Sequence, residues 1–63
     1  MYIIELPGYG FFKASYDSFM GNVGSRQQAK VWKTREAAER NATRLRGYYS
    51  SIYRQATVVE VAA

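Results

Sequence analysis

The stretch AKVWKTREAAER, residues Ala29–Arg40, decides the fold class because it joins a strand directly to a helix. Its first five residues, Ala29–Lys33, include β-branched and aromatic side chains and predict a strand. Thr34 then offers a hydroxyl that can accept a hydrogen bond from a backbone N–H of the first helical turn. Glu36 lies in that turn, where the helix dipole favours an anion. A strand that ends on a capped helix indicates an α+β domain.

An amphipathic helix follows the cap. Its apolar positions advance by 4, 3, 4 and 3 residues, which places them in one stripe of an α-helix. The stripe consists of Ala38, Ala42, Leu45, Tyr49 and Ile52. Two ends are compatible with it: the helix runs to about Tyr53, or it ends at Arg46 with Gly47 as a left-handed residue just beyond. We favour the longer helix because Tyr49 and Ile52 keep the register of the stripe.

Three further segments predict strands. Tyr2–Leu6 is rich in β-branched and aromatic residues, and residues 7–10 (Pro-Gly-Tyr-Gly) predict a turn. Phe11–Tyr16 alternates between two faces, so it forms a hairpin with the first strand. Gln55–Ala62 contains three valines and predicts the last strand.

The order of these elements is β-β-β-α-β. We therefore predict one compact domain over residues 1–63, with a single four-stranded sheet packed against one helix. The expected sheet order is 4-1-2-3, with strands numbered along the chain. A right-handed crossover through the helix makes the last strand parallel to the third, and through a meander also parallel to the first.

Composition limits the classes of function. Nine Lys and Arg residues against five Asp and Glu residues give a net charge of +4 in 63 residues, which favours a partner with a negative surface. The chain has no Cys and no His, so disulfides, Cys/His metal sites, thiol nucleophiles and the usual base near neutral pH are all excluded. We expect no enzyme activity, no cofactor and no metal. A core this small makes a homodimer a further expectation.

The N-terminus has no basic region followed by a long apolar run, so we expect no signal peptide. No apolar run approaches the roughly 20 residues of a membrane span. We therefore expect a cytoplasmic protein without a membrane partner.

The glycine-rich segment Asp17–Gln28 predicts a long irregular loop with a functional role. It carries Phe19, Met20 and Arg26, which we take as candidate protein-binding residues if they are exposed. The alternative is that Phe19 and Met20 fold back onto the sheet as core. The glycines do not form a phosphate loop, because no Lys-Ser or Lys-Thr pair follows them.

A second hypothesis assigns nucleic-acid binding to basic residues near the helix. These residues are Lys30, Lys33, Arg40, Arg44 and Arg46. They could follow a phosphate backbone, but the chain lacks the aromatic motif of an RNA-recognition sheet and any long basic run. A solvated helix face is the simpler interpretation, since Glu36 can pair with Arg40 one turn away.

Trp32 has two possible environments. The parity of the strand Ala29–Lys33 would point it away from the helix, onto a sheet face that also carries Phe11, Lys13 and Ile3, whereas a bulge or strand end would turn it into the core. An exposed aromatic sheet face would suit a dimer or a partner protein. A buried Trp32 is the preferred interpretation, because a small domain needs its largest apolar side chain in the core.

The junction Ala29–Glu39 resembles the strand, Thr/Ser cap and x-Glu-Ala-x-x joint of many small uncharacterised phage and prophage proteins. The resemblance covers about a quarter of the chain and identifies no functional residue. It implies a phage accessory protein that binds a host factor. Together with the composition, it predicts a non-enzymatic phage or mobile-element protein that binds, and in doing so inhibits, a host protein.

Overall fold

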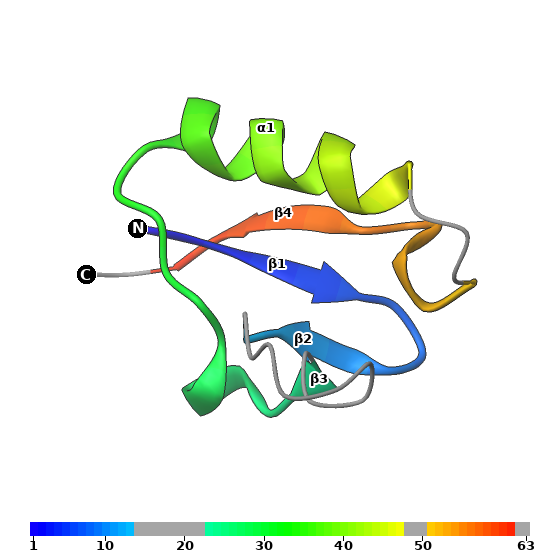
Figure 1. The fold of residues 1–63 in the computed structure, drawn as a ribbon. Helices are drawn as coiled ribbons and strands as arrows, with labels where there is room; N and C mark the ends of the chain where they lie inside the picture. Colours follow the sequence, from blue (N-terminus) through cyan, green and yellow to red (C-terminus); the bar gives the residue numbers. More distant parts are fainter. Residues whose placement is uncertain (14–22, 48–50, 62–63) are drawn as a thin grey trace.

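The computed structural model describes residues 1–13, 23–47 and 51–61, which form an α+β fold (Figure 1). The sequence predicted this class correctly. The four strands are β1 (Tyr2–Leu6), β2 (Gly10–Phe12), β3 (Val23–Gly24) and β4 (Thr57–Glu60). The helical elements are α1 (Arg35–Arg46) and two 3₁₀ turns, η2 (Arg26–Gln28) and η3 (Ser51–Tyr53).

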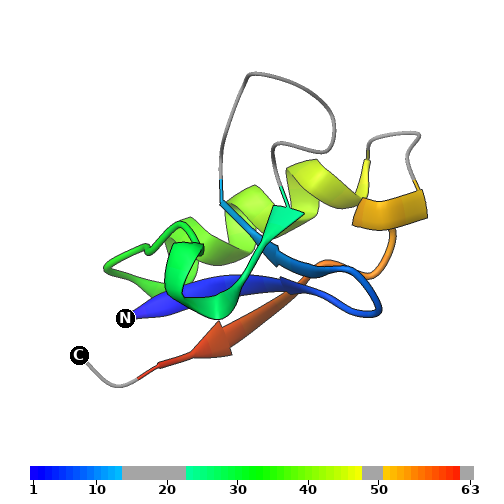
Figure 2. The same ribbon diagram turned by 90° about the horizontal axis from the view of Figure 1, so that it is seen from below.

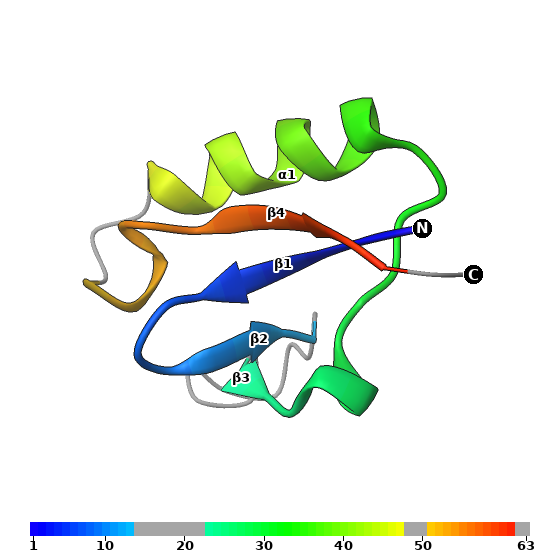
Figure 3. The same ribbon diagram turned by 180° about the vertical axis from the view of Figure 1, so that it is seen from behind.

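The sheet has the order β3-β2-β1-β4, which confirms the predicted order. Every neighbouring pair is antiparallel. The helix α1 packs against β1 and β4, whereas η2 and β3 lie on the opposite side of the molecule (Figures 1 and 3), and Figure 2 shows them in front of α1. The sheet therefore has one face covered by α1, which we call the helix face, and a second face, which we call the open face.

The third strand is not the predicted one. It is Val23–Gly24, which pairs with β2 inside the segment expected to be an irregular loop. A Cβ on Gly24 would lie 2.7 Å from Oε1 of Gln28 in η2 and 2.9 Å from Cδ of Lys13, so a larger residue here would have to displace these two side chains. The predicted strand Ala29–Lys33 is reduced to one antiparallel bridge, in which Trp32 exchanges both backbone hydrogen bonds with Tyr2, at 2.8 and 2.9 Å.

The predicted direction of β4 is wrong: β4 runs antiparallel to β1, not parallel. The crossover argument itself holds, since Trp32 and β4, before and after α1, both run antiparallel to β1. The predicted direction was wrong because the prediction did not include the chain reversal at β3 and η2, which precedes Trp32. Sequence periodicity does not detect a strand of two residues.

The helix also ends earlier than preferred. It stops at Arg46, and Gly47 donates its N–H to Arg44 at 3.1 Å in a right-handed conformation with φ −81°, so the alternative end was right but its left-handed glycine was not. Ile52 still reaches the core, because the 3₁₀ turn η3 buries it. The apolar stripe predicted only that Ile52 is buried. A separate 3₁₀ turn can bury it just as a longer helix would. Tyr49 lies outside the described residues.

The core lies between α1 and the helix face. Alternate residues of β1 turn Ile4 and Leu6 inward, and both are fully buried. They pack with the apolar stripe of α1, with the 3₁₀ turn η3 and with the residue just before β4. The cluster comprises Ile4, Leu6, Phe12, Ala42, Leu45, Ile52, Tyr53 and Ala56. Burial of this apolar surface is the main favourable contribution to folding.

Trp32 packs against this core from the helix face, but it is only partly buried, not fully buried as preferred. Its ring stacks on Phe12 with centroids 6.2 Å apart and an interplanar angle of 14°. The bridge to Tyr2 explains the orientation, because directly paired residues share a face and Tyr2 alternates with Ile3 onto the helix face. Val31 is thereby turned to the open face.

The start of α1 is fixed as the sequence predicted. Thr34 is the N-cap, and its Oγ1 accepts from the N–H of Ala37 at 3.2 Å. The Arg35 guanidinium lies 5.4 Å from the centre of the Tyr2 ring, so the first helical residue also contacts β1.

Candidate protein-binding pocket

The open face contains a pocket of about 320 Å³. Its lining is mainly aliphatic, with two polar side chains at the side formed by η2. The lining residues are Ile3, Arg26, Gln27, Val31 and Val61.

Three backbone features bring the aliphatic residues together. Ile3 alternates with Ile4 and so points away from α1. Val61 follows β4 and donates its N–H to the Met1 carbonyl at 2.9 Å, which sets it beside the start of β1. Val31 precedes the bridge to Tyr2 and is 48% exposed. An aliphatic floor thus lies between two strand ends and the segment before α1.

The polar side of the pocket is held by the short turn η2. Gln28 accepts from the Ser25 N–H at 3.0 Å through Oε1 and donates its own N–H to the Ser25 carbonyl at 3.0 Å. This reciprocal pair fixes both ends of the turn and leaves Arg26 and Gln27 exposed. In the described part of the chain, no Asp or Glu forms an ion pair with Arg26. The Arg26 side chain is exposed, so its guanidinium can reach an external acceptor.

Of the predicted protein-binding residues, Arg26 lies in this pocket, whereas Phe19 and Met20 lie outside the described residues. Ile3 was expected on the open face, which is correct. Val61 and Val31 were missed as site residues. Their signal is present in the alternation of the strands, but using it requires the register of β4 and the bridge at Trp32, which the sequence does not supply.

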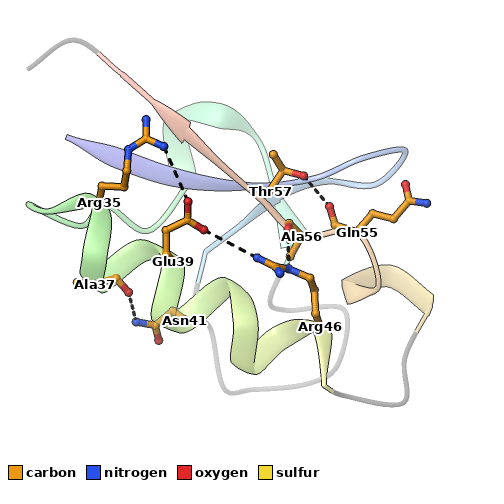
Figure 4. A network of polar contacts seen from close by, with 8 residues as sticks. All are labelled: Arg35, Ala37, Glu39, Asn41, Arg46, Gln55, Ala56 and Thr57. Atoms are coloured by element: carbon orange, nitrogen blue, oxygen red, sulfur yellow. Dashed lines mark hydrogen bonds and ion pairs between the residues drawn. The ribbon is translucent and has the colours of Figure 1, made fainter.

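The predicted basic residues do not form one continuous cationic surface, because acids are interleaved with them. Arg40 lies 3.5 Å from Glu36. Glu39 lies between Arg35 and Arg46, at 3.8 and 3.9 Å. Figure 4 shows the contacts of Glu39 with Arg35 and with Arg46 along α1.

Arg46 has a structural contact as well. Its Nε donates to the Ala56 carbonyl at 3.1 Å (Figure 4), so the end of α1 is tied to the chain just before β4. The remaining predicted residues, Lys30, Lys33 and Arg44, are exposed and have no ion pair within the described ranges. They lie before α1 and in its last turn, and the structure does not gather them at one point.

Other features offer less chemistry. A second hollow of about 230 Å³ is lined by Pro7, Tyr9, Ile52, Arg54 and Gln55. Within residues 1–13, 23–47 and 51–61, no three His, Cys, Asp or Glu side chains gather as metal ligands would. The same residues contain no helix with the length and apolar character needed to cross a membrane.

Comparison with known proteins gave no match to a family model, to a curated protein or to a solved structure. The likeness to phage and prophage proteins stays a prediction from the junction at Thr34.

Proposed function

We propose that this chain is a non-enzymatic binding protein that occupies a surface of another protein through the pocket on its open face. The observation that carries the proposal is the aliphatic floor of Ile3, Val31 and Val61 beside the exposed guanidinium of Arg26, which pairs with no Asp or Glu among the described residues. An apolar hollow with one charged group at its side is typical of sites that anchor a single side chain of a partner.

The pocket defines the chemistry of the partner. Its volume of about 320 Å³ is at the lower end of the range for ligand pockets and suits one large aliphatic or aromatic side chain. A carboxylate next to that side chain would accept a charge-assisted hydrogen bond from Arg26. The net charge of +4 favours approach to an acidic surface. The partner is thus a protein with an apolar residue set among acidic ones.

The proposal has two further parts: the chain is of phage or mobile-element origin, and it inhibits the host protein that it binds. Their support is the sequence resemblance at the strand-to-helix junction. A protein of this size can inhibit simply by covering a surface that its target needs, which requires no catalytic group.

A capture experiment with matched variants tests the proposal. The full chain is immobilised, bacterial lysate is passed over it at moderate and at raised salt, and the retained protein is measured for wild type, Val31→Asp, Arg26→Glu and Lys33→Glu. Val31→Asp and Arg26→Glu change the pocket, whereas Lys33→Glu makes the same charge reversal at an exposed residue outside its lining.

We expect a specific protein to be retained by wild type and by Lys33→Glu but lost with both pocket variants. Retention that is equal in all four chains would contradict the pocket as the binding site. Dichroism spectra of each variant establish that it is folded.

Nucleic-acid binding is the alternative. It is favoured by the exposed Lys30, Lys33 and Arg44, which form no ion pair with another described residue. It predicts that labelled DNA or RNA binds at low salt and that the affinity falls steeply with salt, with a log-log slope near the number of phosphates contacted. Lack of binding to single- and double-stranded DNA and RNA at low salt would eliminate this alternative.

A further inference from the structure

The strand β4 lies at one edge of the sheet and pairs on only one side, with β1. Its register pairs Ile3 with Val59, and Val61 donates its N–H to Met1 at 2.9 Å. In an antiparallel pair, alternate residues turn their backbone N–H and C=O groups toward the neighbouring strand. Positions 57, 59 and 61 therefore face β1, whereas Val58 and Glu60 direct their backbone groups outward.

The row of backbone groups directed away from β1 ends where these groups are already hydrogen-bonded within the chain. Ala56, the next outward position, donates its N–H to the Tyr53 carbonyl at 3.2 Å and accepts from Arg46 Nε at 3.1 Å, as Figure 4 shows for the second contact. Both backbone groups of Ala56 are therefore satisfied inside the chain. In the part of the chain that the structure describes, no strand pairs with the outward groups of Val58 and Glu60.

We propose that a second copy of this chain pairs with this edge, so that two β4 strands form an antiparallel ladder around a two-fold axis at Val59. Val58 of each subunit then exchanges both backbone hydrogen bonds with Glu60 of the partner subunit, which gives four hydrogen bonds. This register uses every outward group between Ala56 and the end of β4. The result is one sheet that continues through both subunits, with a helix face on each.

A second copy fits because the edge is complementary to itself. Glu60 is exposed and forms no ion pair with any described residue. In the proposed register, Glu60 of the partner subunit lies opposite Val58 and diagonal to Ala56, where the Arg46 guanidinium is held. The two-fold axis repeats this acid–base contact, as an interface between identical surfaces requires.

The two acid–base contacts offset the repulsion between subunits that each carry +4. The edge also lacks two residue types, Pro and Lys, that often prevent pairing at a sheet edge. β4 reads Thr-Val-Val-Glu and contains no Pro and no Lys, and exposed edges with apolar side chains of this kind pair readily with another chain.

Sedimentation velocity of the full chain, from micromolar to millimolar concentration, tests the proposal with three variants. Glu60→Pro removes an outward N–H that takes no part in pairing with β1, so the fold tolerates it. Glu60→Lys keeps the backbone and reverses the charge that faces Arg46. Glu36→Lys makes the same change of net charge on the exposed side of α1 and is the matched control.

We expect wild type and Glu36→Lys to dimerise, and Glu60→Pro and Glu60→Lys to raise the dimer dissociation constant by about tenfold or more, which corresponds to the loss of one or two good polar contacts. Amide exchange supplies a readout inside the wild-type protein. The amides of Val58 and Glu60 should become protected as concentration rises, whereas that of Val59 is protected throughout because it faces β1.

A wild-type chain that stays monomeric at millimolar concentration would overturn the proposal. So would a dimer that persists unchanged in both Glu60 variants, or amides of Val58 and Glu60 whose exchange is independent of concentration. The pocket on the open face is measured separately by partner capture, so failure of the dimer leaves the proposed function standing.

Discussion

The two faces of β1 differ in what covers them, although their residues alternate along the same five-residue strand. Ile4 and Leu6 on the helix face are fully buried under α1 and η3. Ile3 on the open face is 2% exposed, but the neighbouring Val31 is 48% exposed and the surface between them is hollow. The helix face therefore supplies most of the stability, and the open face retains apolar surface that a partner can cover.

Truncation on the helix face should have the largest effect. Leu6→Ala removes a fully buried side chain from the core, which costs about 2–5 kcal/mol. A single core of this size rarely supplies more than about 3–5 kcal/mol, so the variant should be largely unfolded at room temperature. Urea unfolding followed by Trp32 fluorescence measures the change. Leu6→Met keeps the volume and is the control, and a stable Leu6→Ala variant would mean that the helix face is not the main core.

Loss of the helix cap should have an intermediate effect. Thr34→Ala removes the acceptor for the Ala37 N–H, a bond of 3.2 Å, and should lower the free energy of unfolding by about 1 kcal/mol. Thr34→Ser keeps the hydroxyl and should retain most of the stability. The same urea titration compares the two. If Ser and Ala were equally destabilising, the contribution of Thr34 would come from its methyl group and not from the cap.

A pair of valines compares the two faces directly. Val58→Ser acts on the helix face, where Val58 packs against the core, and should cost about 1 kcal/mol of stability. Val31→Ser acts on the exposed side of the pocket and should change stability by less than about 0.5 kcal/mol. Partner capture should show the reverse order, with Val31→Ser the weaker binder. Equal losses of stability would show that the open face is also part of the core.

The smallest effect is expected at the outer side of α1. Glu36→Gln removes an ion pair of 3.5 Å between side chains that are 88% and 69% exposed, so it should cost a few tenths of a kcal/mol and less at high salt. Glu39→Gln should cost more, because Glu39 lies between two arginines. Thermal unfolding at two salt concentrations measures both. A larger loss with Glu36→Gln would indicate that the interaction of Glu36 with the helix dipole outweighs the two ion pairs of Glu39.

Local signals allowed much of the fold to be predicted. The cap at Thr34, the stripe through Ala38 and Leu45, and the turn after Leu6 each depend on residues within a few positions of one another. Propensity and periodicity report such short-range preferences well. They were sufficient for the α+β class, whereas the predicted sheet order was confirmed with a different segment as its third strand.

The candidate site was predicted less well, because it depends on contacts between distant segments. Arg26 was singled out for its place in a glycine-rich segment, but Val61 joins it only through the register of β4. Arg46 is predicted to bind phosphate in the nucleic-acid hypothesis, and the structure adds a hydrogen bond from its Nε to the carbonyl of Ala56 that the sequence did not predict. A basic side chain at a helix end has the same sequence pattern whether it faces solvent or a strand edge.

The sequence by itself determined where α1 begins, which residues of β1 can be buried, and that the chain has no Cys and no His. These properties follow from residue chemistry and from hydrogen bonds over one or two turns. Only the tertiary structure decided that Val23–Gly24 is the third strand, that β4 runs antiparallel to β1, and that α1 stops at Arg46. Each of these depends on which distant segment satisfies a backbone group or an apolar surface. Several segments of the chain could have done so, and only their packing together selects among them.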